Sequence, residues 1–203
     1  NELDVLVNEA IANAVDAFRE HSVKPGKIDI TFTKKDSKVG YLTFHNNAPP
    51  MTEKQFYGES GYHKVSFSAK QKGQGIGFAG VGAKVYLAVG DFVRIFTETC
   101  CGNESWSSEM YRKGNDLMHS TPKKSSRKKN GTYYKVLINY TDYLELQQSL
   151  EDWVRMFCNN ALLNGIKISV NGKSIKPWIP ETSKTKNYIV TAENKKFPCK
   201  LHL

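Results

Sequence analysis

The first apolar pattern in the chain has the period of an amphipathic helix. From residue 3 to residue 18 the sequence contains neither Gly nor Pro, and apolar residues recur three and four positions apart. At about 100° per residue these side chains cover about half of the helix surface, more than a helix at the edge of a core needs. The pattern therefore predicts a largely buried helix, whose apolar positions are Leu3, Leu6, Val7, Ala10, Ile11, Ala14, Val15, Ala17 and Phe18.

The following segments alternate between apolar and polar residues with a period of two, which is typical of strands joined by tight turns. Pro and Gly residues separate them, and two further stretches have helical spacing. The predicted strands are 28–33 and 39–44 as a hairpin, 92–99 and 104–111 as a second hairpin, 132–140, 166–170 with 174–175, and 188–191. The predicted helices are 52–57, with Thr52 as N-cap, and 83–89. A third, longer helix begins at Thr141 or Asp142 as N-cap and runs to about Leu163. Residues 58–76 are predicted to form a long loop.

The chain has 203 residues and 39% hydrophobic residues, enough for one sizeable α/β domain. We expect that domain over 1–175 and an extension, or the start of a following region, over 176–203. The chain begins at Asn1 rather than Met, and we interpret it as part of a longer protein. No apolar run is long enough to span a membrane, and the four cysteines have no ligand-like spacing. We therefore expect reduced thiols and a cytoplasmic location without membrane contact.

The net charge of +9 permits anionic partners, and the basic residues are concentrated in two segments. One lies at 123–129 and the other at 184–200. Both are consistent either with solvated loops or with a contact to nucleic acid, such as DNA, or to another polyanion. No aromatic residues interleave with 123–129, which argues against base stacking at that cluster.

Candidate chemistry begins on the first helix. Glu9, Asn13 and Asp16 fall on one narrow stripe beside the apolar one. A helix this buried seldom keeps two acids and an amide in line unless they have partners. A solvated strip is the alternative interpretation. On the later helix we expect Met156 and Phe157 to be buried, and we expect Trp178 to pack at the core or its edge.

A glycine-rich segment runs from Gly77 to Gly82 and leads into the helix predicted over 83–89. Glycines let backbone N–H groups approach an anion, and a helix N-terminus favours negative charge. A phosphate would fit there, although a flexible turn has the same composition. The segment lacks the Gly-Lys-Ser/Thr of a Walker loop and the preceding strand of a dinucleotide fold.

Together these blocks resemble the GHKL superfamily of ATPases, and within it topoisomerase VI B subunit-like proteins. Glu9, Asn13 and Asp16 match the family pattern E-x-x-x-N-x-x-D without a gap. Gly77, Gly80 and Gly82 match G-x-x-G-x-G, and Gly131-Thr132 matches the Gly-Thr that leads a strand. The four blocks, counting a degenerate one at 46–51, occur in the family order over about residues 2–175.

The resemblance implies a two-layer α/β sandwich of the GHKL (Bergerat) type, in which a mixed, mostly antiparallel sheet carries its helices on one face. It implies that Glu9 is the catalytic base, that Asn13 holds Mg²⁺, and that residues 58–76, with Lys70 and Gln74, form a lid. The residues implied in nucleotide binding are Asn13, Asp16, Asn46, Met51, Lys72, Gly77, Gly80, Val81, Gly82, Ala83, Lys84 and Thr132. Lys84 is equally well explained as a solvated side chain.

The block at 46–51 departs from the family pattern. Asn46 stands where the family has the Asp that accepts a hydrogen bond from adenine, and Ala48 and Pro50 stand where it has glycines. A hydrogen bond to a neutral acceptor contributes roughly 1 kcal/mol less than one to a charged acceptor. We therefore expect adenine to bind more weakly by a factor of less than about ten. The prolines predict a stiffer loop.

The resemblance therefore implies ATP binding and Mg-dependent ATP hydrolysis that drives a conformational change or the closure of a homodimer. Two alternatives remain on the same fold. One is a nucleotide-binding switch with little turnover, which the sequence at 46–51 suggests. The other is a DNA-associated interaction module, which the net charge suggests.

Overall fold

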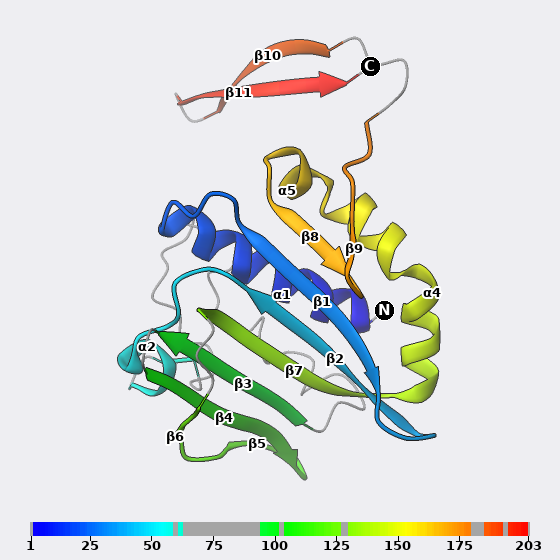
Figure 1. Ribbon diagram of the computed structural model, residues 1–203. Coiled ribbons are helices and arrows are strands. Elements are labelled where there is room, and N and C mark those ends of the chain that lie inside the picture. Colours follow the sequence, from blue (N-terminus) through cyan, green and yellow to red (C-terminus); the bar gives the residue numbers. More distant parts are fainter. Residues whose placement is uncertain are drawn as a thin grey trace.

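The structure is a computed structural model that describes residues 2–58, 61–62, 94–101, 104–126, 130–179, 185–192 and 195–202. Its helices and strands follow the order in Figure 1. The helices are α1 (Glu2–Glu20), α2 (Glu53–Tyr57), α4 (Tyr140–Phe157) and α5 (Asn159–Leu163). The strands are β1 (Lys27–Lys34), β2 (Val39–Asn46), β3 (Arg94–Cys101), β4 (Glu104–Lys113), β5 (Asp116–His119), β6 (Lys123–Lys124), β7 (Gly131–Asn139), β8 (Lys167–Val170), β9 (Lys173–Ser174), β10 (Thr185–Ala192) and β11 (Lys195–His202).

Among the described residues, nine strands form one sheet in the order β5-β4-β3-β7-β2-β1-β8-β9, and β6 pairs with β4. Its neighbouring strands are antiparallel except for β1 and β8, which run parallel. The order places β7 between β3 and β2, so the two predicted hairpins are joined through a later strand. This is the mixed, mostly antiparallel sheet that the resemblance implied.

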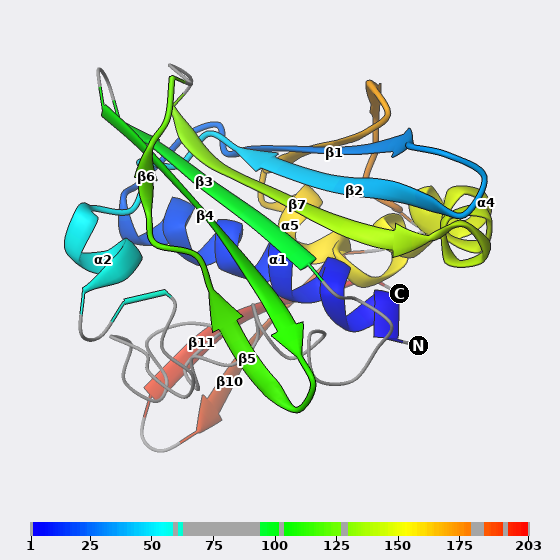
Figure 2. The same cartoon turned by 90° about the horizontal axis from the view of Figure 1, so that it is seen from below.

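The helices α1, α4 and α5 lie on one face of this sheet (Figures 1 and 2). Every second residue of the strands points into the core beneath them. On β1, for example, Ile28 and Ile30 are buried while Asp29 and Thr31 are exposed. The core cluster joins these side chains to apolar residues of α1 and α4 such as Leu6 and Leu150. The sheet therefore has one face that is buried beneath helices and one face that no helix of the described chain covers.

Two features of the long C-terminal helix differ from the prediction. It begins at Tyr140 directly after β7, and its N-cap residue Asn139 makes no side-chain capping hydrogen bond, so neither Thr141 nor Asp142 is the cap. It also ends at Phe157, because the backbone of Cys158 leaves helical geometry before α5 begins.

The burial expected for the apolar residues near the end of this helix was wrong. Met156 is 68% exposed and Phe157 60% exposed. The core face of α4 runs through Leu150 and Val154, which are four residues apart, and the C-cap residue Cys158 continues this line into the core. This spacing turns Met156 and Phe157 outward. Trp178 is also exposed, while its backbone N–H donates to Asn159 Oδ1 at 2.7 Å.

The sequence beyond residue 184 forms a second, two-stranded sheet of β10 and β11. Only 188–191 was predicted as a strand there, and β5 and β6 were also missed. The division of the chain at residue 175 stays a prediction. Among the described residues, no helix combines the length and the apolar character needed to cross a lipid bilayer.

Candidate functional site

The polar stripe of α1 lies at the boundary between the buried and exposed sides of the helix. Asp16 is almost fully buried, Glu9 is partly buried, and Asn13 is exposed. The apolar neighbours Leu6, Val15 and others fix this orientation by packing into the core. One helix thus presents two carboxyl groups and an amide where the core meets solvent.

Glu9 and Asp16 influence each other electrostatically. Burial raises the pKa of the Glu9 carboxyl above its ordinary value of 4.5, and the charge of Asp16 raises this pKa further. Both effects disfavour the negative charge on Glu9, so a cation at this place would relieve an existing cost. A raised pKa also brings a carboxylate closer to the basicity that proton transfer near neutral pH needs.

These residues suit a hard cation. Carboxylate and amide oxygens are the ligands that Mg²⁺ prefers, and Mg²⁺ commonly takes only one or two of them from protein, with the rest from phosphates and water. The described residues contain no group of three or more His, Cys, Asp or Glu that could hold a metal ion. The donor set on α1 therefore fits Mg²⁺ that arrives with a phosphate ligand better than a closed protein-only metal site.

The 46–51 segment follows a path fixed by its own hydrogen bonds. The backbone N–H of Ala48 donates to Asn46 Oδ1 at 3.1 Å. Asn47 ties the segment to the start of β1, because its Oδ1 accepts from the backbone N–H of Lys27 at 2.6 Å and its Nδ2 donates to the Pro25 carbonyl at 3.1 Å. The oxygen of Asn46 is therefore already engaged, although an amide oxygen can accept a second hydrogen bond.

Gly131 brings the Gly-Thr pair directly against Asn46. Its φ of +103° is one that L side chains rarely adopt, and a Cβ built there would lie 1.6 Å from the backbone oxygen of Asn46. Nearby, His45 Nε2 lies 3.1 Å from the backbone oxygen of Asn130, a residue 85 positions later. The fold thus joins two of the predicted motif blocks at one point, with Thr132 as the next residue.

Thr132 continues into a polar strip on the helix-covered face of the sheet. The β3–β7 register places Thr99 opposite Thr132, and Thr97 follows two residues earlier on the same face. The Thr97 hydroxyl donates to the Tyr62 hydroxyl at 3.0 Å. The Thr99 hydroxyl is buried and has no hydrogen-bond partner in the part of the chain described. A buried hydroxyl without a hydrogen bond lowers the stability of the fold. The Thr99 hydroxyl therefore marks a position where a polar ligand would supply the missing hydrogen bond.

Sequence reasoning missed Thr97 and Thr99. A signal existed, because both share the alternation of Ile95, which is a core position. A polar residue at such a position is informative in the same way as the acids on α1. Without the register to β7, however, nothing in the sequence connected Thr99 with Thr132.

Met51 is partly buried and immediately precedes Thr52, the N-cap residue of α2. A capping box fixes the start of that helix as predicted: the Thr52 backbone N–H donates to Gln55 Oε1 at 2.9 Å, and the Gln55 backbone N–H donates to Thr52 Oγ1 at 3.3 Å. The structure therefore gives Met51 a defined position after the 46–50 segment.

The phosphate-binding part of the expected site lies outside the described residues. The same holds for the predicted helix 83–89 and for most of the predicted lid 58–76. The residues concerned are Lys70, Lys72, Gln74, Gly77, Gly80, Val81, Gly82, Ala83 and Lys84. Their roles stay predictions.

No family model matches this sequence, and no curated protein matches it either. The comparison with solved structures nevertheless defines the class of fold, which is that of the GHKL ATPase domains. The particular structures are topoisomerase II enzymes. Two are the ATPase region of Saccharomyces cerevisiae topoisomerase II, alone and bound to ICRF-187 (dexrazoxane); each has a TM-score of 0.60 and 18% identity, over 86% of this chain and 49% of the other.

A third is the ATPase and transducer domains of DNA topoisomerase II from Balamuthia mandrillaris, with a TM-score of 0.59 and 13% identity over 86% of this chain and 48% of the other. The chain thus spans about half the length of the structures it matches. At this identity the likeness establishes the fold. The more specific resemblance to topoisomerase VI B stays a prediction.

Proposed function

We propose that this chain binds ATP with Mg²⁺ and hydrolyses it, in a site between α1 and the helix-covered face of the sheet. The observation that carries the proposal is the state of Glu9. It is a half-buried carboxyl with a raised pKa, one turn from an exposed amide at Asn13 and coupled to the buried Asp16. Polar groups in this arrangement at the edge of a core are typical of a reaction centre.

Glu9 would accept the proton of the water that attacks the γ-phosphate, or orient that water. Asn13 would hold Mg²⁺, and Asp16 would support the shell of ligands around the metal or the water network at the base. When bound, the metal neutralises charge on the phosphates, which is the main chemical need of phosphoryl transfer. The other residues would act by positioning. Gly77, Gly80 and Gly82 would present backbone N–H groups to phosphate, and Lys72 and Lys84 would add positive charge.

The base of the nucleotide would lie near Asn46 and Thr132. The unpaired hydroxyl of Thr99 opposite Thr132 supports this placement, because a ligand hydrogen bond would satisfy it. Asn46 is a neutral acceptor that already accepts a hydrogen bond from the Ala48 N–H. We therefore expect it to bind adenine more weakly than Asp would, by a factor of less than about ten. An amide also donates, which would relax discrimination against guanine.

The output would be a conformational switch, with closure of a homodimer over the bound nucleotide as one form of it. The part of this chain that matches covers about half of the topoisomerase II structures, so other parts of a larger protein would carry that output. A role beside DNA is compatible with the net charge of +9.

A second function, nucleotide binding with little turnover, is favoured by one observation. The hydrogen bonds of Asn46 and Asn47 hold the segment before Pro49 and Pro50 in a fixed path, where adjustment around a substrate would be costly. Such a protein would report the presence of nucleotide without consuming it.

Steady-state phosphate release with Glu9→Ala tests the first function. We expect a loss of at least about 100-fold, the usual contribution of a general base, while ATP binding by calorimetry persists. Glu20→Ala removes an exposed acid from the end of the same helix and should leave the rate unchanged. Hydrolysis that survives Glu9→Ala would remove the assigned base.

Calorimetric titration of ATP, GTP and ADP with and without Mg²⁺ separates the two functions. Mg-dependent ATP binding with phosphate release supports the ATPase. Tight binding without release supports the switch, and absence of binding to any of the three contradicts both.

A further inference from the structure

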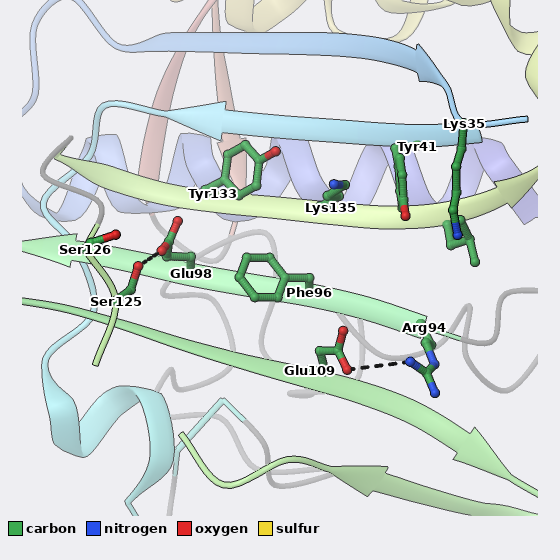
Figure 3. Close-up of a pocket in the computed structure, with 11 residues that line it drawn as sticks. Lys35, Tyr41, Arg94, Phe96, Glu98, Glu109, Ser125, Ser126, Tyr133 and Lys135 are labelled. Carbon is green, nitrogen blue, oxygen red and sulfur yellow. Dashed lines mark hydrogen bonds and ion pairs between the residues drawn. The ribbon is translucent and has the colours of Figure 1, made fainter. Parts of the chain in front are cut away.

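The face of the sheet opposite to α1 carries a groove of about 770 Å³ (Figure 3). This volume lies in the range of small-molecule and nucleotide sites. Alternating side chains of β2, β7 and β3 form its floor, so it is built on rigid strands. The lining residues that matter most are Lys35, Tyr41, Arg94, Phe96, Tyr133 and Lys135.

Three aromatic residues contribute to the groove from three neighbouring strands. Tyr41 lies on β2, Tyr133 on β7 and Phe96 on β3, and each is partly exposed. The rings of Phe96 and Tyr133 are 6.4 Å apart in an edge-to-face arrangement. Half-exposed rings on an open sheet are the usual platform on which unpaired bases stack.

Positive charge gathers at one end of the groove. Lys135 Nζ lies 3.8 Å from the centre of the Tyr41 ring, and Lys35 Nζ lies 5.7 Å from it. Arg94, which is largely exposed, reaches the same end from β3 (Figure 3). Three cations beside an aromatic floor suit a ligand that combines phosphates with flat rings.

The groove also contains two acids, which offset part of the charge of its three cations. Glu109 is paired with Arg94 at 3.9 Å. Glu98 is 5% exposed, accepts a hydrogen bond from the Ser125 hydroxyl, and lies at the other end, beside Tyr133. The two ends of the groove therefore differ in chemistry. Phosphates are favoured at the end near Lys135, and base edges that form hydrogen bonds are favoured at the end near Ser125.

We infer that this groove binds single-stranded nucleic acid, with phosphates on Lys35, Arg94 and Lys135 and bases against Phe96 and Tyr133. An acidic peptide would use the cations but leave the aromatic floor without a function. A duplex would meet the cations but could not bring its stacked bases to the rings. The net charge of +9 adds non-specific attraction for the same partner. The inference does not depend on the proposed ATPase, because the groove and α1 lie on opposite faces (Figure 3).

The test is fluorescence anisotropy of the full chain with a labelled oligonucleotide about 12 nucleotides long, within the site sizes of known single-strand modules. A duplex of the same sequence and an oligoglutamate of equal length serve as competitors. Phe96→Leu and Tyr133→Leu keep apolar volume but remove the stacking surface, and thermal melts confirm that each variant is folded. We expect each to weaken single-strand binding by about fivefold or more.

Lys135→Gln should lower the slope of log affinity against log salt by about 0.7, the effect of one lost phosphate contact on a single strand. Lys54→Gln and Lys176→Gln remove the same charge from exposed positions outside the groove and should change affinity by less than about twofold. Saturating ATP should not compete.

Three results would overturn the inference. One is equal binding by the parent and both leucine variants. Another is a loss in Lys54→Gln as large as in Lys135→Gln, which would reduce the effect to overall charge. The third is preferential binding of the duplex or of oligoglutamate, which would assign the groove to another partner.

Discussion

The two faces of the sheet are made by alternate residues of the same strands, yet they differ in every property that matters for function. On β7, Tyr134, Val136 and Ile138 enter the core beneath the helices, while Tyr133 and Lys135 face the open groove. The covered face packs the apolar core, and the open face carries charge and aromatic rings. Neighbouring residues on one strand therefore separate folding from recognition.

The covered face is itself not uniform. Most of it is apolar, but Asp16, Thr97 and Thr99 are buried there among the apolar residues. Thr97 donates to Tyr62, whereas the Thr99 hydroxyl has no partner among the described residues, and we therefore place the proposed nucleotide near Thr99. The open face also has buried polar groups, but Glu98 there accepts a hydrogen bond from the Ser125 hydroxyl.

The largest expected effect tests which face stabilises the fold. Ile30→Ala removes a fully buried side chain and should lower the free energy of unfolding by about 2–5 kcal/mol. Thr31→Ala, one residue later on the open face, should change it by less than about 0.5 kcal/mol. Urea denaturation of both variants measures the difference, and similar losses would mean that the open face is also packed.

The next effect tests the junction beside the covered face. Gly131→Ala would place a Cβ against the backbone oxygen of Asn46 at a strained φ, and we expect a cost of about 3 kcal/mol or more. Gly172→Ala has a similar positive φ but open space around it, so only about 1 kcal/mol is expected. Equal costs for the two variants in urea denaturation would show that the contact with Asn46 is relaxed.

A smaller effect of opposite sign is expected at the polar strip. Thr99→Val removes a buried hydroxyl that lacks a partner among the described residues, and should stabilise the free protein by about 1 kcal/mol. If the hydroxyl contacts nucleotide, the same change weakens ATP binding by up to about tenfold in calorimetry. Thr43→Val, a buried threonine on the opposite face, should leave ATP binding unchanged. An unaltered ATP affinity in Thr99→Val would move the base-binding region elsewhere.

The smallest effect concerns the pH dependence of Glu9. Its folded pKa is raised above 4.5, so between that value and the raised pKa the folded state binds more protons than the unfolded state. Stability therefore falls as pH rises through this window, and Glu9→Gln should stabilise the protein at neutral pH but not in acid. Because solvent screens a half-exposed group, we expect less than about 1 kcal/mol.

Thermal melts across pH measure the effect of Glu9→Gln on stability. Phosphate release should follow the opposite course in the parent chain, rising with pH through the raised pKa as the base becomes ionised. A stabilisation that is the same in acid and at neutral pH would contradict the desolvation of Glu9.

Local patterns predicted a large part of the fold. The helix over 3–18, the hairpin strands at 28–33 and 39–44, and the start of α2 at Thr52 are all present. Each depends on contacts between residues close in sequence, which propensity and periodicity register directly. The errors at Cys158 and Met156 arose because packing of α4 against the sheet, not the local pattern, sets which helix face is buried.

The sequence by itself determined that Glu9, Asn13 and Asp16 share one stripe, because a helix has a fixed period. It also determined that strands of alternating character would have two unlike faces. Only the tertiary structure decided that β7 lies between β2 and β3, which brings Gly131 against Asn46, Thr99 opposite Thr132, and Phe96 beside Tyr133. Pairing between distant strands depends on the free energy of the whole core, which no local window of sequence contains.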